Sequence, residues 1–476
     1  MKKAHKAGFD SKLVSSLREA IHLCGIKSGM TISFHHHLRD GDYVINLVCA
    51  ELEDMGIRDI TLHSSGLLQG NSPVIRQINS GTITSIETTG IGVDIGKELA
   101  KGIMGNPAQM RTHGGFPAAV THGNVRIDVA FLAASAADCM GNMNGTDGTS
   151  AFGSAGYAYL GAEYADKVVV VTDNILDYPL QRYTIDETQV DYVVKVNAIG
   201  DPAGITSGTV RLTKDPVHLH IAKYAMDVIR SSGLFRDGMS FQTGTGGPSL
   251  AVTKFLKEAM LQESIKGSFI LGGISAYSVE LLESGLFDTI LDTQSFDLAA
   301  IISIQENSKH QEISASRYAN PFVPSCALDS LDVGILSAIE IDLDFNVNVH
   351  LSSDGCLMGG SGGHGDVADS AKLAIIAAPL VRARTSVVVD KVLCKSTPGE
   401  VVDVFVTELG IAVNPCRPDL KASIAAAGLP VRDIAELYQT AISLTGTPRK
   451  PVFGDKLVAQ VYHRTNVLMD EIYNLV

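Results

Sequence analysis

The sequence has no apolar run long enough to cross a membrane, and it has little positive charge. A membrane-spanning helix needs about 20 apolar residues. The longest run here, Leu373 to Val381, is shorter, contains Pro379 and is typical of a buried strand. The 38 lysines and arginines are outnumbered by 52 aspartates and glutamates, which gives a formal net charge of -14. Nucleic acids and anionic membranes are bound by positively charged surfaces, so we expect no nucleic acid and no membrane among the partners.

Closely spaced cysteine pairs are also missing. The seven cysteines are scattered along the chain, and no Cys-x-x-Cys pair indicates a zinc or dithiol site. Reduced thiols in an intracellular protein are the simplest interpretation. The basic start, Met1-Lys2-Lys3, is not followed by the apolar run of a signal peptide. We therefore expect the protein to be cytoplasmic.

Glycine, in contrast, is abundant, with 46 residues that punctuate short apolar runs. A chain of 476 residues exceeds one ordinary core and predicts two or three domains. A leading helix is expected over residues 10–25, where apolar side chains recur at three- and four-residue steps up to Gly25. From Met30 onward, strand patterns alternate with helical ones. This alternation predicts an α/β fold with a parallel or mixed sheet.

The two halves of the sequence also resemble one another. Residues 29–37 recur as residues 238–248, and both segments predict a strand, a loop and a helix. Residues 127–144 match residues 331–348, with aspartates and asparagines in phase at both ends. The order of these matches indicates an internal duplication.

We therefore predict two tandem, internally repeated α/β domains. The first is expected over residues 1–228, including the leading helix, and the second over residues 229–476. The segment after about residue 385 is expected to complete the second domain. Sites in such proteins often lie between domains.

A glycine-rich loop, Met358 to Asp366, follows the apolar and strand-like run from Asp332 to Val349. We call it the glycine loop. Glycine has no Cβ and can take positive φ, so its backbone N–H groups can approach a ligand closely. The counterpart in the first half, Ser154-Ala155-Gly156, is less rich in glycine. This difference predicts a division of labour between the two halves.

A second loop, Gly244 to Pro248, is expected to open a helix whose terminal N–H groups could accept a phosphate or another anion. The loop lacks the Gly-Lys-Ser/Thr ending of a P-loop and the full dinucleotide-binding fingerprint. Packing of a tight turn is the alternative interpretation.

Basic residues in a third loop are candidates for binding an anion. His35, His36 and His37 precede Arg39. Adjacent histidines on a strand point to opposite faces, and no glutamate or cysteine lies at a ligand spacing, so we predict no metal site. Imidazole N–H groups and a guanidinium can instead bind a carboxylate. Exposed loop histidines without a function are the alternative.

Two further features have both a structural and a functional interpretation. Arg111 and His113 stand beside two glycines, which is typical of either a carboxylate cradle or a surface turn. Glu340 lies between two isoleucines, where a carboxylate is costly unless it is paired, and we favour a salt bridge within the sheet over catalysis. The chain has no Gly-x-Ser-x-Gly elbow, and no serine, histidine and acid set can be joined into a triad.

These motifs resemble the coenzyme A transferase superfamily. The run Leu336 to Leu343 followed by Gly360 to Asp366 is similar to acyl-CoA hydrolases and carboxylate CoA-transferases. Over nearly the whole chain, the sequence resembles the citrate lyase alpha subunit family. The stretches that carry this likeness are His36 to Asp42, His113 to Gly115, Ser353 to Gly355, Gly362 to His364 and Gly410 to Pro415. The resemblance implies two CoA-transferase-like domains of the NagB/RpiA type.

The resemblance also implies an activity and partners. Members of the family transfer an acyl-carrier-protein thiol from acetate to citrate, which produces citryl-carrier protein and acetate. A beta subunit then cleaves the citryl thioester. The thiol belongs to a phosphoribosyl-dephospho-CoA arm, a CoA-type phosphopantetheine group on the gamma subunit, so no cofactor need be held permanently. An oligomeric complex with the beta and gamma subunits is expected.

Candidate residues follow from this activity. Citrate carries three negative charges and needs a basic pocket. We assign it to His35, His36, His37, Arg39, Arg111 and His113. The N–H groups of Gly362 and Gly363 are expected to stabilise the oxyanion of the attacked thioester. The carrier arm is expected at Gly244, Gly246, Gly247, Gly360, Ser361 and His364.

One departure bears on the mechanism. Related transferases with a covalent intermediate carry a glutamate in a Gly-Ile-His-Ser/Thr-Glu context, whereas the corresponding stretch here, Gly272 to Tyr277, has no acid. We therefore predict direct transfer in a ternary complex. A shifted alignment would make Glu280 or Glu283 the nucleophile instead. The alternative functions are an acyl-CoA hydrolase, a carboxylate CoA-transferase of another specificity, and a non-catalytic assembly subunit.

Overall fold

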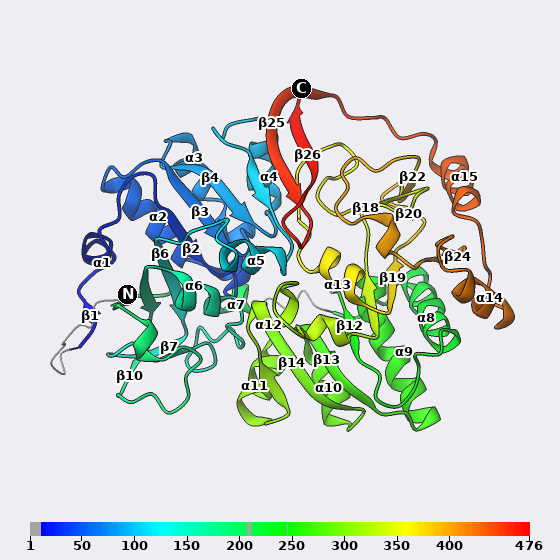
Figure 1. Cartoon of the computed structure of the whole chain (residues 1–476), viewed down its shortest axis with the longest axis horizontal. Coiled ribbons are helices and arrows are strands. Elements are labelled where there is room, and N and C mark those ends of the chain that lie inside the picture. Colours follow the sequence, from blue (N-terminus) through cyan, green and yellow to red (C-terminus); the bar gives the residue numbers. More distant parts are fainter. Residues whose placement is uncertain (1–10, 207–210, 245) are drawn as a thin grey trace.

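The computed structural model of the chain describes residues 11–206, 211–244 and 246–476. Two large sheets with helices packed against them lie side by side and define two halves of the molecule (Figure 1). Most neighbouring strands run parallel, as expected for strands that are joined by helical crossovers. The predicted α/β fold is confirmed.

The first sheet contains ten strands in the order β1-β11-β9-β6-β2-β3-β4-β5-β25-β26. Their bounds are β1 Leu13–Val14, β2 Thr31–Phe34, β3 Ile60–Ser64, β4 Ile83–Thr88, β5 Ala108–Met110, β6 Val129–Ala134, β9 Lys167–Thr172, β11 Tyr192–Lys195, β25 Phe453–Tyr462 and β26 Leu468–Leu475. The helices of this half are α1 Leu17–Leu23, α2 Val44–Asp54, α3 Val74–Asn79, α4 Val93–Ala100, α5 Gly115–Thr121, α6 Ala158–Tyr164 and α7 Pro202–Ile205. Strands β6 and β9 are apolar and buried over almost their whole length, as expected for central parallel strands covered on both faces.

The second sheet contains eight strands in the order β15-β14-β13-β12-β16-β19-β23-β24. Their bounds are β12 Phe241–Thr243, β13 Gly267–Ile274, β14 Phe287–Ser295, β15 His310–Glu312, β16 Val333–Leu336, β19 Leu373–Ala377, β23 Val404–Thr407 and β24 Gly410–Val413. The helices are α8 Pro216–Ser231, α9 Gly247–Glu263, α10 Ala276–Glu283, α11 Leu298–Glu306, α12 Ala315–Ala319, α13 His364–Ser370, α14 Pro418–Ala426 and α15 Ile434–Thr445. Within the described residues, no helix combines the length and the apolarity needed to cross a membrane.

The internal repeat is confirmed at the ends of β6 and β16. Each strand leads into a small three-stranded sheet, made of β7 Ala136–Asp138, β8 Met143–Asn144 and β10 Ile175–Leu176 in the first half, and of β17 Glu340–Asp342, β18 Val347–Asn348 and β22 Val388–Val389 in the second. The N–H of Asp138 donates to the carbonyl of Asn142, and the N–H of Asp342 donates to the carbonyl of Asn346, both at 3.0 Å. The predicted single run from 332 to 349 is therefore three short strands.

The leading helix is shorter than predicted. Leu13 and Val14 form the edge strand β1, which pairs with β11. Helix α1 then begins after Ser16, whose hydroxyl accepts a hydrogen bond from the N–H of Glu19 at 3.2 Å. Gly25 follows the helix with φ +66°, in the left-handed region that glycine adopts without strain.

The last two strands do not complete the second domain, contrary to the prediction for the C-terminal segment. Strand β25 pairs in parallel with β5, and β26 pairs with β25, so this C-terminal hairpin extends the first sheet (Figure 1). It covers the edge of β5, which would otherwise expose unpaired backbone groups. The predicted boundary between residues 228 and 229 lies inside α8, which shares its core with the second sheet.

Arg464, at the turn of the C-terminal hairpin, connects this hairpin to the second half. Its side chain is only 4% exposed. The guanidinium lies 3.7 Å from the carboxylate of Asp366 and 3.3 Å from that of Asp369, and it donates to the carbonyl of Ala319 at 2.9 Å. The hairpin therefore pairs with one sheet while its turn is bonded to the other half.

Replacing Arg464 by methionine should leave the buried Asp366 without its counter-charge. Loss of one partner of a buried ion pair is strongly destabilising, so we expect the free energy of unfolding in urea to fall by about 3 kcal/mol. Arg18→Met is the control, because the Arg18–Glu51 pair is exposed and should contribute less than about 1 kcal/mol. Equal effects of the two substitutions would contradict the role of Arg464.

Candidate active site

A cavity of about 400 Å³, which we call the central cavity, lies where the two halves meet. Its walls in the second half come from the carboxyl ends of β12, β13, β14 and β16, the position at which α/β sheets usually bind ligands. The lining residues are His113 and Tyr157 from the first half, and Gln242, Thr243, Gly244, Gly246, Gly272, Gly273, Thr293, Gln294, Phe296, Tyr318, Leu336, Ser337, Ala338, Ile339, Val349, Gly360, Ser361, Gly363, His364, Val367 and Arg382 from the second.

His35, His36 and His37 are buried behind the wall of this cavity and do not line it. Nε2 of His35 donates to the carbonyl of Ala133 at 3.0 Å, and its Nδ1 lies 2.8 Å from Nδ1 of His37. Burial lowers the pKa of His35 to about 4 and that of His36 to about 3. Burial also lowers the pKa of His37, so the three rings are neutral, and the alternative of exposed loop histidines is wrong.

His36 acts on the cavity through a neighbour. Its Nδ1 lies 2.6 Å from the hydroxyl of Ser65, and its Nε2 lies 3.0 Å from Oε1 of Gln294, which lines the cavity. These contacts fix the orientation of the Gln294 amide. Across the described residues, no group of three or more histidines, cysteines, aspartates and glutamates has a metal-binding arrangement.

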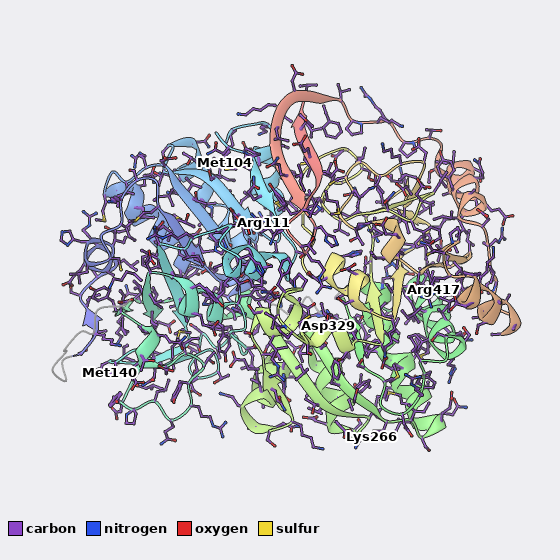
Figure 2. All side chains as sticks on the ribbon, in the orientation of Figure 1. Met104, Arg111, Met140, Lys266, Asp329 and Arg417 are labelled. Atoms are coloured by element: carbon purple, nitrogen blue, oxygen red, sulfur yellow. The ribbon has the colours of Figure 1, made fainter. Side chains whose placement is uncertain are left out.

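The two arginines assigned to citrate also lie outside the central cavity. Arg111 is buried beside the C-terminal hairpin (Figure 2), where it binds Glu87 at 2.8 Å and donates to Oδ1 of Asn466 at 2.7 Å. The predicted carboxylate cradle is therefore occupied by Glu87. Arg39 donates to the carbonyl of Phe296 at 2.8 Å and lies over its ring. It supports Phe296, which lines the cavity.

His113 is the one histidine of the predicted citrate set that reaches the central cavity. Its backbone N–H donates to the carbonyl of Gly362 at 2.7 Å, and its ring lies 5.1 Å from that of Tyr157. Burial lowers the pKa of His113 to about 3, so the imidazole is neutral. It can donate or accept a hydrogen bond but supplies no positive charge.

The glycine loop meets the prediction in part. Gly363 lines the cavity, and its N–H has no acceptor among the residues described. The N–H of Gly362 instead donates to the carbonyl of Thr89 at 3.1 Å, so it is not available as an oxyanion donor, and Gly362 does not line the cavity. The backbone turns away at this residue, which has φ +47°.

The residues predicted for the carrier arm lie mostly at the cavity. Gly244, Gly246, Gly360, Ser361 and His364 line it, whereas Gly247 begins α9 and lies against His218. Nε2 of His364 donates to the carbonyl of Ser337 at 2.7 Å, and Nδ1 lies 2.8 Å from the hydroxyl of Thr397. Both ring nitrogens of His364 are thus bonded to protein, and burial lowers its pKa to about 4.

Three polar residues of the cavity wall were not predicted from the sequence. Nε2 of Gln242 donates to the hydroxyl oxygen of Tyr318 at 2.7 Å. Oε1 of Gln242 and the hydroxyl of Thr293 are buried and have no partner in the described part of the chain. Tyr318 lies beside the glycine loop, since a Cβ on Gly363 would be 2.6 Å from its hydroxyl. No motif marked these residues, because each reaches the cavity only through the fold.

Side-chain charge in the central cavity is very limited. None of its lining residues is an aspartate or glutamate, and Arg382 is the only lysine or arginine among those described. Glu280 binds Lys257 at 2.6 Å, and Glu280 and Glu283 line a separate surface cleft. Glu340 follows the lining residue Ile339 but does not itself line the cavity: its carboxylate accepts from Asn348 at 2.9 Å and from the N–H of Leu393, so it is hydrogen-bonded rather than ion-paired.

Asp366 connects the glycine loop to the first half. Its carboxylate accepts hydrogen bonds from the hydroxyl of Thr112 at 2.7 Å and from the N–H of Gly114 at 3.0 Å. Burial raises the pKa of Asp366 to about 6, and Arg464 opposes part of this shift. The residue next to Thr112 is His113, so the same contact sets the position of the histidine relative to Gly363.

The substitution Asp366→Asn should change how stability depends on pH. The pKa of Asp366 in the folded protein lies above its value in the unfolded chain. Its contribution to the free energy of unfolding is therefore fully present below about pH 4 and is lost as the pH rises through about 6. Asparagine does not titrate. The Tm of the variant relative to the wild type should therefore rise between pH 5 and pH 7.

Asp288→Asn is the matched control for this measurement. Asp288 is exposed, and Lys266 holds its pKa below the usual range, so it stays ionised throughout this window. Its Tm relative to the wild type should not change between pH 5 and pH 7. If the Tm of Asp366→Asn relative to the wild type also stayed constant between pH 5 and pH 7, this result would contradict the raised pKa of Asp366.

Comparisons with known proteins cover almost the whole chain. Residues 10–475 match the family described as citrate lyase, alpha subunit (CitF). The chain is 48% identical over 461 residues to a citrate lyase alpha chain from Klebsiella pneumoniae, covering 97% of this chain and 91% of that protein. It is 45% identical to a citrate lyase alpha chain from Haemophilus influenzae, with 98% and 93% covered.

Solved structures of similar proteins share the fold of this chain. A crystal structure described as the alpha subunit of citrate lyase in complex with citrate, from Streptococcus mutans, superposes with a TM-score of 0.98 and is 47% identical, covering 99% of this chain and 93% of that one. The alpha subunit of a malonate decarboxylase from Acinetobacter baumannii has a TM-score of 0.67 at 14% identity, over 92% of this chain and 95% of that one. At that identity the likeness concerns the fold alone.

Proposed function

Because the chain belongs to the citrate lyase alpha subunit family, the transferase component of citrate lyase, we propose that it exchanges acetyl for citryl on the thiol of an acyl-carrier protein. The substrates are acetyl-carrier protein and citrate, and the products are citryl-carrier protein and acetate. The partners are the beta and gamma subunits of the complex. The thiol ends a phosphoribosyl-dephospho-CoA arm on the gamma subunit, so this chain holds no cofactor permanently.

The observation that carries the mechanism is the absence of a carboxylate side chain from the described lining of the central cavity. A covalent glutamyl route would need such a side chain at the thioester. We therefore infer direct transfer, with citrate and the acetyl thioester bound together. Holding the two reactants in one cavity converts their encounter into an effectively unimolecular step.

The transfer balances without a general base. A carboxylate oxygen of citrate attacks the thioester carbonyl, and the carbon–sulfur bond breaks to release the thiolate and form an acetyl–citryl anhydride. The thiolate then attacks the citryl carbonyl of this anhydride, and acetate leaves. No proton moves in either step, which is consistent with the neutral and fully bonded ring of His364 and the depressed pKa of His113.

Each step develops negative charge on a carbonyl oxygen. The N–H of Gly363 and the hydroxyl of Tyr318 are adjacent donors at the cavity wall. Burial raises the pKa of Tyr318, so its hydroxyl stays protonated, and the bond from Gln242 to the hydroxyl oxygen leaves the proton free to point into the cavity. We assign these two donors to the oxyanion. Apolar residues of the same wall, Leu336 and Ile339, suit the arm that carries the thioester.

The substitution Tyr318→Phe tests this assignment. It removes one donor to the transition state, and such a loss costs about 3–4 kcal/mol, so kcat should fall by about 10²- to 10³-fold. The KM values for citrate and for the acetyl donor should change little, because the contact strengthens only as charge develops. Tyr159→Phe is the control, since Tyr159 is partly buried two residues from Tyr157 and does not line the cavity. A loss of less than threefold in kcat would contradict the role of Tyr318.

The activity itself is tested with acetyl-CoA or acetyl-carrier protein, citrate and the purified chain, alone and with both partner subunits. The expected result is acetate formed only when citrate is present. Acetate released without citrate would instead indicate a hydrolase. A folded chain that forms no acetate even with its partners would indicate an assembly subunit. Incubation with acetyl-CoA followed by hydroxylamine should label no glutamate, and a labelled glutamate would overturn direct transfer.

A further inference from the structure

Arg382 supplies the single fixed positive charge of the central cavity among its described lining residues. The arginines predicted to bind citrate are engaged elsewhere, Arg111 with Glu87 and Arg39 with Phe296. The lining histidines, His113 and His364, are neutral because burial lowers their pKa values. A substrate with three carboxylates therefore meets one permanent cation in this cavity.

The position of Arg382 is fixed by a small hairpin rooted in the core. It belongs to β20 Val381–Arg382, which pairs with β21 Thr385–Ser386, so Arg382 lies opposite Thr385. At the base, the N–H of Val387 donates to the carbonyl of Leu380 at 3.0 Å, and both residues are fully buried. The Arg382 side chain thus extends from a hairpin whose base is held in the core.

The tip of this hairpin is strained. Its two central residues, Ala383 and Arg384, have φ values of +47° and +69°. A two-residue hairpin with a type I′ turn needs positive φ at both positions and usually has asparagine, aspartate or glycine there. Such strain persists where the surroundings over-determine the backbone, often at a ligand-binding site. The chain accepts a strained turn here and thereby places Arg382 at the cavity.

The guanidinium of Arg382 is held on one side and unpaired on the other. Its Nη1 donates to the carbonyl of Ala338 at 2.9 Å, and no carboxylate in the described part of the chain forms an ion pair with it. The side chain remains exposed while it lines the cavity, which places it at the opening. Partial desolvation lowers the pKa of Arg382. A partly desolvated cation without a counter-charge is an incomplete ion pair that an anion would complete.

Arg382 also belongs to the same wall as the proposed reaction centre. The carbonyl that it binds, Ala338, follows Ser337, whose carbonyl accepts from His364. His364 is in turn the neighbour of the oxyanion donor Gly363. Two hydrogen bonds to the adjacent carbonyls of Ser337 and Ala338 therefore connect the arginine to the glycine loop.

We infer that Arg382 binds a non-reacting carboxylate of the tricarboxylate substrate and so selects citrate over smaller carboxylates. This inference rests on the proposed function. The planar guanidinium matches a carboxylate through two parallel N–H groups and remains charged throughout the working pH range. Citrate carries its carboxylates only a few carbon–carbon bonds apart, so one can reach Arg382 while another reacts. The phosphate of a carrier arm is separated from its sulfur by the whole pantetheine unit, which disfavours it as the partner.

The test is steady-state kinetics of acetate formation with the full chain and its partner subunits, for the wild type, Arg382→Gln and Arg384→Gln. Arg382→Gln should raise the KM for citrate by about 10- to 100-fold and leave the KM for the acetyl donor within about twofold. Arg384→Gln is the matched control, because Arg384 sits at the tip of the same hairpin but lines a different cleft. It should change neither KM. Circular dichroism and Tm check that both variants fold.

A second measurement keeps the inference testable if Arg382→Gln folds poorly. Arg382→Lys retains the positive charge but loses the planar pair of N–H groups of the guanidinium. It should therefore recover part of the citrate affinity that Arg382→Gln loses. In addition, the wild type should prefer citrate to an analogue that lacks one carboxylate, and Arg382→Gln should lose most of this preference.

The outcomes separate this inference from the function on which it rests. A wild type that forms no acetate from citrate refutes the function. An active wild type with an unchanged citrate KM in Arg382→Gln refutes only the role of Arg382. A rise in the KM for the acetyl donor alone would assign the arginine to the carrier arm and would also overturn the inference.

Discussion

The carboxylate of Asp366 is the contact on which the geometry of the cavity depends. It lies in the first turn of the helix that follows the glycine loop, it is fully buried, and it accepts hydrogen bonds from Thr112 and Gly114 of the other half. A charge in such a position is costly unless it is paired, and Arg464 supplies the counter-charge from the C-terminal hairpin. Three segments that are remote in sequence therefore meet at one carboxylate, and the distance between His113 and Gly363 is fixed as a result.

The fold could be predicted from the sequence because its determinants are local or repeated. The apolar run of residues 373–377 predicts strand β19, and the glycine turn before α9 predicts that helix. The duplicated aspartates and asparagines marked equivalent turns, and Asp138 and Asp342 make the same backbone contacts. The C-terminal hairpin was assigned to the wrong sheet, because nothing in a strand's own sequence states which distant edge it will cover.

The candidate site was less predictable, since residue type does not reveal a partner. Arg111 has the charge expected of a citrate ligand, but Glu87 occupies it, and the three adjacent histidines are buried and neutral. Gly363 was found because a glycine loop is visible in sequence, whereas Tyr318 and Arg382 come from stretches without a motif. The predicted division of labour also changes: most of the cavity wall comes from the second half, and the first half contributes His113 and Tyr157.

The route of the chain through the first sheet has a consequence for biosynthesis. Strand β5 acquires its outer neighbour only from β25, which the ribosome makes after the entire second sheet. A nascent first half therefore exposes an open strand edge, and Asp366 has no counter-charge until Arg464 emerges. The cavity is thus completed late in synthesis, and a growing chain has no finished site at which to bind a thioester.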